Sequence, residues 1–299
     1  MTGGEAATRV RRGGPHRALV SVIALTATFM LVEAAGGILS GSLALLSDAG
    51  HMLTDLLALV LSLMAVRFAS LPATPGRSYG YHRVEILSAL FNGSLLILLS
   101  GVLLYNAARR LTHPVAIDGG IMLGVAAVGL LANLVAIALL ARCESNLNVR
   151  GARMHLIGDA LSSFGVVLAA VVINLTGWTP IDPILGGVIA VVIVVGAFRL
   201  VREAVDVLLE SAPAGIDPDQ VSRAILTVPG VLEVHDLHIW SITTGLPALS
   251  GHVRVRAAEA NGGDQMLDLI KRTLRDRFGI VHTTIQMETP DYRDLGDIH

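Results

Sequence analysis

The stretch LALLSDAGHMLTDLLALVLSLMAV, residues 43–66, is apolar over the length of a bilayer-spanning helix, yet it contains His51 and Asp55. Residues i and i+4 lie on the same face of a helix, about one turn apart. Ionisable side chains are costly in a bilayer and normally face the interior of a helical bundle or a watery cavity. The stretch therefore predicts a membrane helix whose polar face binds something charged.

The same spacing recurs farther along the chain, where His155 and Asp159 occupy another apolar segment. Two imidazoles and two carboxylates form a suitable tetrahedral ligand set for a zinc-like divalent ion. The alternative is that these residues make isolated hydrogen bonds between helices. The repeated spacing favours a shared metal site formed by His51, Asp55, His155 and Asp159.

Asp48 lies on the same helical stripe as His51 and Asp55. Three roles are open to it: a fifth metal ligand, an outer partner that orients His51, or a proton carrier. The orienting role is the favoured one, because metal-bound histidines usually donate their second ring N–H to a carboxylate or carbonyl.

The composition supports a membrane protein, because 53% of the 299 residues are hydrophobic and only 15% are charged. A single cysteine, Cys143, excludes an intrachain disulfide and a thiolate-rich metal cage. The net charge of −2 argues against a nucleic-acid partner. Six stretches are long enough to span a bilayer. They cover residues 18–39, 43–66, 85–107, 115–141, 155–175 and 184–208.

The arginines predict the orientation, because short loops rich in Lys and Arg stay in the cytoplasm. With residues 1–17 as a cytoplasmic tail, nearly all loop arginines fall on the cytoplasmic side, and Arg109 and Arg110 are the exceptions. The first apolar stretch is interpreted as a membrane helix rather than a signal peptide, because no clear cleavage site follows it. We therefore expect a membrane domain over 18–209, both termini in the cytoplasm and, without a targeting signal, a bacterial inner membrane.

Residues 210–299 are much less apolar and predict a separate cytoplasmic domain. Asp217 and Pro218 are typical of a helix start, and Pro229-Gly230 ends that helix. Two strands follow, at about 233–242 and 249–257, then a helix with an apolar stripe that Gly279 closes, then a strand at about 281–288. This αββαβ order predicts an α+β sandwich with helices on one face of a three-stranded sheet.

The chain resembles the cation diffusion facilitator family of zinc and heavy-metal exporters. The resemblance runs over most of the chain and rests on six motifs. They are SLALLSDAGHMLTD at 42–55, YGYHRVE at 79–85, HLIGD at 155–159, VHDLHIW at 234–240, SGH at 250–252 and TIQME at 284–288. It implies six transmembrane helices, a ferredoxin-like cytoplasmic domain, homodimers and metal-for-proton exchange by alternating access. His51 at the first position of its motif is similar to the zinc-preferring branch, whereas Asp there accompanies broader selectivity.

The resemblance also implies metal sites in the cytoplasmic domain, at His235, His252 and Glu288. His282 is a further candidate, and Gln286 stands where other members have His. His235 and His238 are three apart, so a regular strand would point them to opposite faces. His82, in the basic loop before the third span, is an accessory metal candidate for which a structural role is favoured.

The predicted function is therefore export of Zn²⁺, with Cd²⁺ or Co²⁺ as further substrates, in exchange for protons. The partners are divalent metal ions, protons, membrane lipid and a second copy of the chain, with no organic cofactor. Two alternatives remain: a membrane-anchored metal sensor without transport, and a membrane zinc hydrolase. A hydrolase keeps an open coordination position and needs a general base, whereas four ligands are already available here, so no enzyme activity is expected.

Overall fold

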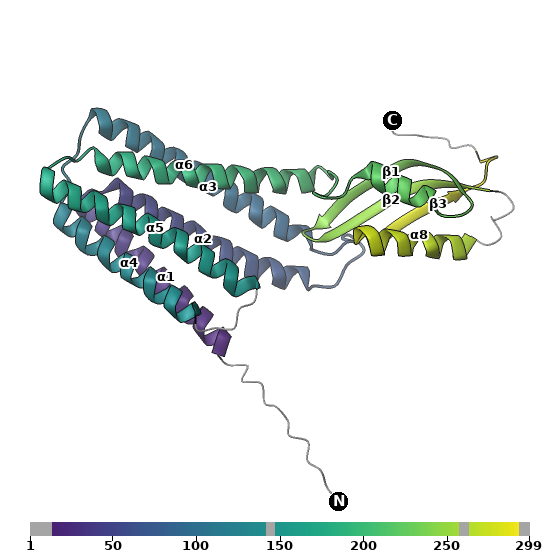
Figure 1. Ribbon diagram of the computed structural model, residues 1–299, viewed down its shortest axis with the longest axis horizontal. Helices are drawn as coiled ribbons and strands as arrows, with labels where there is room; N and C mark the ends of the chain where they lie inside the picture. The colour runs from purple at the N-terminus through teal and green to yellow at the C-terminus, as the bar shows by residue number, and fades with distance from the viewer. Residues whose placement is uncertain (1–13, 142–146, 257–262, 293–299) are drawn as a thin grey trace, which may run out of the picture. The chain divides into compact units, whose positions relative to one another are not determined.

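The computed structural model describes residues 14–141, 147–256 and 263–292 (Figure 1). It divides into two compact units, one formed by residues 1–60 and 92–198 and the other by residues 61–91 and 199–299. All six predicted spans are present as helices. They are α1 (Gly14–Ser40), α2 (Leu43–Ala69), α3 (Arg83–Thr112), α4 (Gly119–Ala141), α5 (Leu147–Thr176) and α6 (Ile181–Leu208).

Five of these helices, α2 to α6, are long and apolar enough to cross a membrane, and the described apolar part of α1, Thr26–Ser40, is shorter. In the first unit α4 packs against both α1 and α5. A buried cluster between α2, α4 and α5 contains several alanines, of which Ala126, Ala169 and Ala170 are almost fully buried. Small side chains let membrane helices approach closely, so α4 is a central element of this unit.

Asp182, near the start of α6, is fully buried and forms hydrogen bonds with the first residues of α2. Its carboxylate accepts hydrogen bonds from Ser42 Oγ at 2.5 Å, from Leu43 N at 2.7 Å and from Ala44 N at 3.1 Å. These backbone amides belong to the first turn of a helix, where they have no partner within the helix. Asp182 therefore caps α2 from a different helix.

Arg110, an exception to the arginine distribution, is part of the same cluster. Its Nη1 lies 3.8 Å from Asp182 Oδ2 and also donates a hydrogen bond to the carbonyl of Gly41. This arginine thus compensates a buried carboxylate, which accounts for its position without reference to the loop-charge rule.

The C-terminal domain has the predicted αββαβ order. It contains α7 (Pro218–Leu226), β1 (Val231–Thr243), β2 (Leu246–Val255), α8 (Gly263–Phe278) and β3 (His282–Glu288). Asp217 caps α7 as expected, because its side chain accepts a hydrogen bond from Asp219 N at 3.0 Å. The sheet order is β1-β2-β3, with β2 antiparallel to β1 and parallel to β3.

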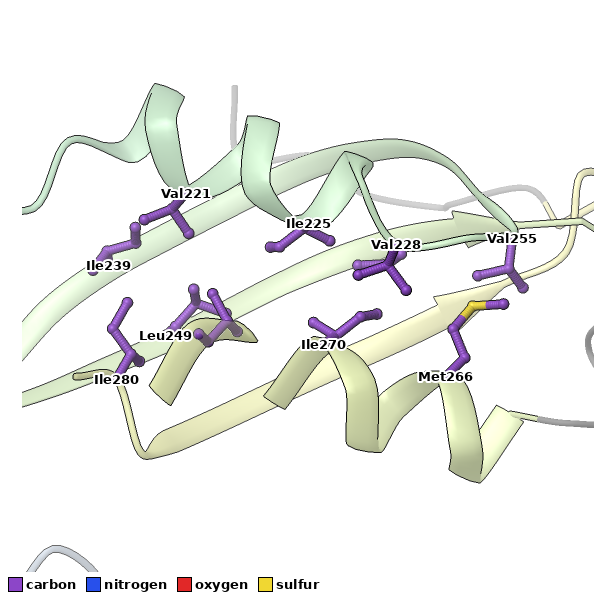
Figure 2. Packing of buried hydrophobic residues seen from close by; sticks show 11 residues of the cluster. Val221, Ile225, Val228, Ile239, Leu249, Val255, Met266, Ile270 and Ile280 are labelled. Carbon is purple, nitrogen blue, oxygen red and sulfur yellow. The ribbon is translucent and has the colours of Figure 1, made fainter. Parts of the chain in front are cut away.

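One apolar core joins both helices of this domain to one face of the sheet (Figure 2). It includes Val221 and Ile225 from α7, Ile270 and Leu274 from α8, and alternate residues of β2 such as Leu249 and Val253. Because strand side chains alternate between faces, the intervening residues of β2, including His252, lie on the opposite face. The predicted covering of one face by helices is therefore confirmed.

The sheet has an irregularity that the sequence did not predict. Between His235 and His238 the pairing of β1 with β2 shifts, since His235 pairs with His252 while His238 pairs with Ser250. Asp236, inside this bulge, has φ of +47°, in the left-handed region. An extra residue in one strand reverses the alternation beyond it, so the expectation that His235 and His238 point to opposite faces, made for a regular strand, does not apply.

Candidate metal sites

The helices α2 and α5 bring three of the four predicted transport ligands together. His51 Nε2 lies 3.6 Å from Asp55 Oδ2 on its own helix and 3.8 Å from Asp159 Oδ1 on α5. Asp159 is 6% exposed, whereas His51 is half-buried. His155 belongs to α5, but its side chain lies outside the described part of the structure.

These separations suit a small divalent ion. Nitrogen and oxygen ligands bound to one tetrahedral zinc ion at about 2.0–2.1 Å stand roughly 3.4 Å from each other. At 3.6 and 3.8 Å, His51 therefore needs little movement to share an ion with Asp55 and with Asp159. Two carboxylates would also neutralise its double charge.

The cluster opens on a cavity of about 540 Å³ in the same unit. His51, Asp55, Asp159 and Ser162 provide polar groups, and α6 provides an apolar wall. That wall consists mainly of Leu185, Val188, Ile189, Val192 and Ile193. The cavity gives an ion space to reach the three ligands.

Asp48 is almost fully buried on the same helix as His51. Its two carboxylate oxygens accept hydrogen bonds from Ser162 Oγ at 2.8 Å and Ser163 Oγ at 3.2 Å, both on α5. The carboxylate thus joins α2 to α5 directly behind the candidate ligands. The polar stripes of the second and fifth spans, which include Asp48 on one side and Ser162 and Ser163 on the other, thus face each other, as their helical spacing predicts.

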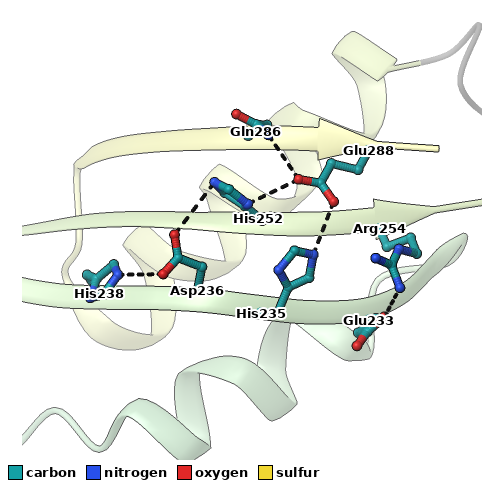
Figure 3. A network of polar contacts seen from close by, with 8 residues as sticks. All are labelled: Glu233, His235, Asp236, His238, His252, Arg254, Gln286 and Glu288. Carbon is teal, nitrogen blue, oxygen red and sulfur yellow. Dashed lines mark hydrogen bonds and ion pairs between the residues drawn. The ribbon is translucent and has the colours of Figure 1, made fainter. Parts of the chain in front are cut away.

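A second cluster lies in the C-terminal domain, on the face of the sheet opposite the apolar core (Figure 3). Glu288 Oε2 lies 3.1 Å from His235 Nε2, and Glu288 Oε1 lies 3.0 Å from His252 Nδ1. One donor atom from each of these residues lies within 4.8 Å of the others. Gln286 Nε2 donates to Glu288 Oε1 at 2.9 Å, so it orients the carboxylate. The register of three adjacent strands brings the residues together.

The bulge places a second interacting pair, Asp236 and His238, next to this cluster. His238 Nε2 lies 2.8 Å from Asp236 Oδ1, and His252 Nε2 lies 3.8 Å from Asp236 Oδ2. The hydrogen bond with His238, helped by the charges of His238, His252 and His235, lowers the pKa of Asp236 below its ordinary value despite partial desolvation. Figure 3 shows this carboxylate between the two imidazoles.

Two other predicted residues lie apart from these clusters. His282 begins β3 and stacks edge to face against Tyr79, with ring centroids 5.7 Å apart, while Glu288 ends the strand. His82 directly precedes α3, where its carbonyl accepts a hydrogen bond from Glu85 N at 3.2 Å. Among the described residues, the metal-binding group found in this domain contains neither histidine.

Two buried acids, Glu33 and Asp182, are 1% and 0% exposed and were not among the predicted site residues. Both carried a signal, because a carboxylate within or beside an apolar span is itself unusual. Asp182 was overlooked because the sixth span was predicted to begin at residue 184. Glu33 was overlooked because no second ionisable residue follows it at helical spacing.

Two family models together match most of the chain. Residues 19–209 match the family model of the cation efflux transmembrane domain, and residues 213–290 match that of the cation efflux protein cytoplasmic domain. The zinc transporter ZitB of Escherichia coli is 42% identical over 275 residues, or 91% of this chain and 87% of that protein. The metal cation efflux system protein CzcD of Cupriavidus metallidurans is 41% identical over 277 residues, or 92% of this chain and 87% of that protein.

A third relative is the cadmium, cobalt and zinc/H⁺-K⁺ antiporter of Bacillus velezensis, which is 40% identical over 275 residues, 91% of this chain and 87% of its own. Among solved structures, the metal-bound C-terminal domain of the CzcD transporter from Cupriavidus metallidurans is 42% identical and has a TM-score of 0.23. It matches 24% of this chain and 99% of that domain.

Proposed function

This chain belongs to the cation efflux family, and from that membership we propose that it exports Zn²⁺ from the cytoplasm in exchange for protons. Cd²⁺ and Co²⁺ are further substrates in this proposal, because ligand chemistry narrows the choice of metal without fixing it. Relatives described as zinc transporters and as a cadmium, cobalt and zinc antiporter support it. The observation that carries the proposal is His51, which stands between two carboxylates from α2 and α5.

The transport site in this proposal consists of His51, Asp55, His155 and Asp159. Imidazole nitrogens bias such a site towards zinc-like ions and away from Ca²⁺ and Mg²⁺, which prefer oxygen ligands. A ligand must be deprotonated to bind metal, so metal and protons compete for the same atoms. Imidazole titrates near neutral pH, which makes exchange for protons chemically natural. Alternating access then exposes the site to each side of the membrane in turn.

The cytoplasmic cluster of His235, His252 and Glu288 is proposed to bind a regulatory metal ion. The donor set, two imidazoles and one carboxylate, suits zinc and leaves a fourth position for water or another ligand. Glu288→Gln in the whole chain should lower the number of zinc ions bound at equilibrium, measured by metal analysis after dialysis. Unchanged zinc content would remove Glu288 from the ligand set.

The remaining parts of the proposal concern assembly and location. We place both termini and residues 210–299 in the cytoplasm, the chain in a bacterial inner membrane, and two copies in each transporter. The arginine-rich loops support this orientation, and the match to the family's cytoplasmic domain supports the placement of the C-terminal residues.

A hydrolase and a non-transporting sensor are the less favoured functions. A catalytic zinc keeps one position for a water molecule, whereas four protein ligands are proposed here, so the chain is proposed not to be an enzyme. A sensor would need only the C-terminal cluster, and buried acids in the membrane helices would serve no purpose in it.

Zinc uptake into proteoliposomes with an imposed pH gradient tests the proposal. Wild type should accumulate zinc only while the gradient lasts, and Asp159→Ala should abolish the uptake. Asp268→Ala, which removes an exposed carboxylate of α8, serves as the matched control and should transport normally. Equal uptake by wild type and Asp159→Ala would exclude the site, and uptake unaffected by an ionophore would exclude proton exchange.

A further inference from the structure

Glu33 is an acidic residue in the middle of the apolar helix α1, and it is 1% exposed. Its Oε2 atom is buried and has no hydrogen-bond partner among the described residues. A buried carboxylate without a partner is costly in any protein, and more so in a membrane. Its retention therefore needs an explanation other than stability.

The neighbouring helix leaves space for this side chain at Gly129 of α4. A methyl group added at Gly129 would lie 2.4 Å from Glu33 Oε1, closer than non-bonded atoms can approach. Only glycine therefore allows the carboxyl group its present position. The contact places Glu33 at the packed interface between α1 and α4.

One turn farther along α4, hydrogen bonds connect this helix to α5 and α2. Asn133 lies one turn after Gly129 on α4, and its Nδ2 donates to Ser163 Oγ on α5 at 3.2 Å. Ser163 in turn donates to Asp48 on α2 at 3.2 Å. Ser163 also lies one turn after Asp159. Buried polar groups from α2, α4 and α5 are thus joined by hydrogen bonds into one array, and Glu33 of α1 packs against α4 one turn away from it.

The charged groups that act on Glu33 are Asp48 from α2 and Asp159 from α5, and both are acidic. From α4 the neighbouring residues are Gly129 and Asn133, which do not titrate. A negative charge at Glu33 would be repelled by both aspartates, and no ion pair with Glu33 is found among the described residues. Burying an unpaired charge is costly, so a neutral carboxyl group suits this buried position better than a carboxylate while the site holds no metal.

We propose that Glu33 carries one of the protons that are exchanged for metal. A divalent ion at the site supplies the positive charge that the array lacks, so Glu33 releases its proton to the cytoplasmic solution as metal binds. When the metal leaves on the other side, Glu33 takes up a proton from that side. This inference rests on the proposed function but adds a proton-carrying residue that contacts none of the proposed ligands in the contacts described above.

The test compares wild type with Glu33→Gln, which keeps the shape of the side chain but cannot ionise. Proteoliposomes containing a pH-sensitive dye and a zinc-sensitive dye report protons moved per zinc ion. Glu33→Gln should move one fewer proton per zinc ion than wild type. Ser100→Ala is the matched control and should keep the wild-type ratio, since Ser100 Oγ on α3 is another buried polar atom that has no hydrogen-bond partner within the described part of the chain.

Should Glu33→Gln be too slow for flux measurements, proton release on zinc binding can be measured at equilibrium. Calorimetry of the purified whole chain, in buffers of different ionisation enthalpy, gives the protons released per zinc ion. Fewer protons from the variant support the inference, and equal numbers overturn it while leaving the exchange intact. If wild type itself moves and releases no protons, the exchange and the inference both fail.

Discussion

At the scale of single residues, His51 is one of the two imidazoles of the proposed transport site and lies next to Asp55 and Asp159. His51→Asp should raise Mn²⁺ flux relative to Zn²⁺ flux by roughly tenfold, because carboxylate oxygens suit harder ions and imidazole suits zinc. Parallel uptake assays in proteoliposomes measure this ratio. The control is His113→Asp, at an exposed histidine after α3, and an unchanged ratio in His51→Asp would show that selectivity lies elsewhere.

Gln286 is the residue that supports Glu288 in the cytoplasmic cluster. Removing its hydrogen bond to Glu288 Oε1 in Gln286→Ala should weaken zinc binding by about 10- to 100-fold, the usual effect of losing an outer partner of a metal ligand. Zinc titration of the whole chain in an Asp159→Ala background isolates this site. The control is Gln265→Ala, at an exposed glutamine of α8. In the same background it should bind zinc as tightly as Asp159→Ala alone.

Some residues of the candidate sites could be predicted from the sequence, and others could not. His51, Asp55 and Asp159 could be grouped because helical spacing and the cost of membrane charges both pointed to them. The roles of Glu33 and Gly129 depend on contact between helices far apart in the chain, which spacing cannot report. Asp236 and His238 depend on a strand bulge, which arises from pairing between strands and has no periodic signal.

At the scale of elements, the cap of α2 by Asp182 predicts a large effect from one substitution. Asp182→Ala removes the partner of Arg110 and the acceptor of two backbone amides, and should destabilise the chain by about 3 kcal/mol, since an unpaired buried charge remains. Thermal unfolding in detergent measures the loss. Asp118→Ala is matched, because Asp118 caps α4 at an exposed position, and it should cost only about 1 kcal/mol.

A comparable loss of stability in both variants would show that Asp182 acts as an ordinary helix cap. Rescue provides an independent check, because adding Arg110→Met to Asp182→Ala should restore part of the stability by removing the unpaired charge. No gain from the second substitution would contradict the role assigned to the Arg110–Asp182 pair.

The elements themselves were largely predictable. Each predicted span corresponds to a helix, and the αββαβ order of the tail is confirmed, because apolar periodicity, Pro218 and Gly279 are local signals. The predicted ends of the helices were less accurate than their number and order. α5 begins at Leu147 rather than near residue 155, since polar residues at a membrane surface can extend a helix beyond its apolar part. The parallel pairing of β2 with β3 could not be predicted from the sequence, because it depends on how the chain crosses between strands in the folded domain.

At the scale of the whole molecule, orientation in the membrane can be tested with the single cysteine. Cys143 lies in sequence between α4 and α5, in a loop proposed to be cytoplasmic. A membrane-impermeant maleimide should therefore label inside-out vesicles and leave right-side-out vesicles unlabelled. The matched variant Cys143→Ser with His113→Cys moves the thiol to the loop between α3 and α4 and should reverse the result. Labelling of wild type from the opposite side would invert the proposed orientation.

The cap of α2 also has a consequence for biosynthesis. Ser42 and Asp182 are 140 residues apart, and a ribosome adds about 5–20 residues per second. The nascent chain must therefore wait on the order of ten seconds, with α2 already made, before the carboxylate that completes its first turn exists. Assembly of the bundle is consequently a late event, and a ribosome that stalls before α6 leaves an insertion intermediate with an exposed helix end, a natural substrate for membrane quality control.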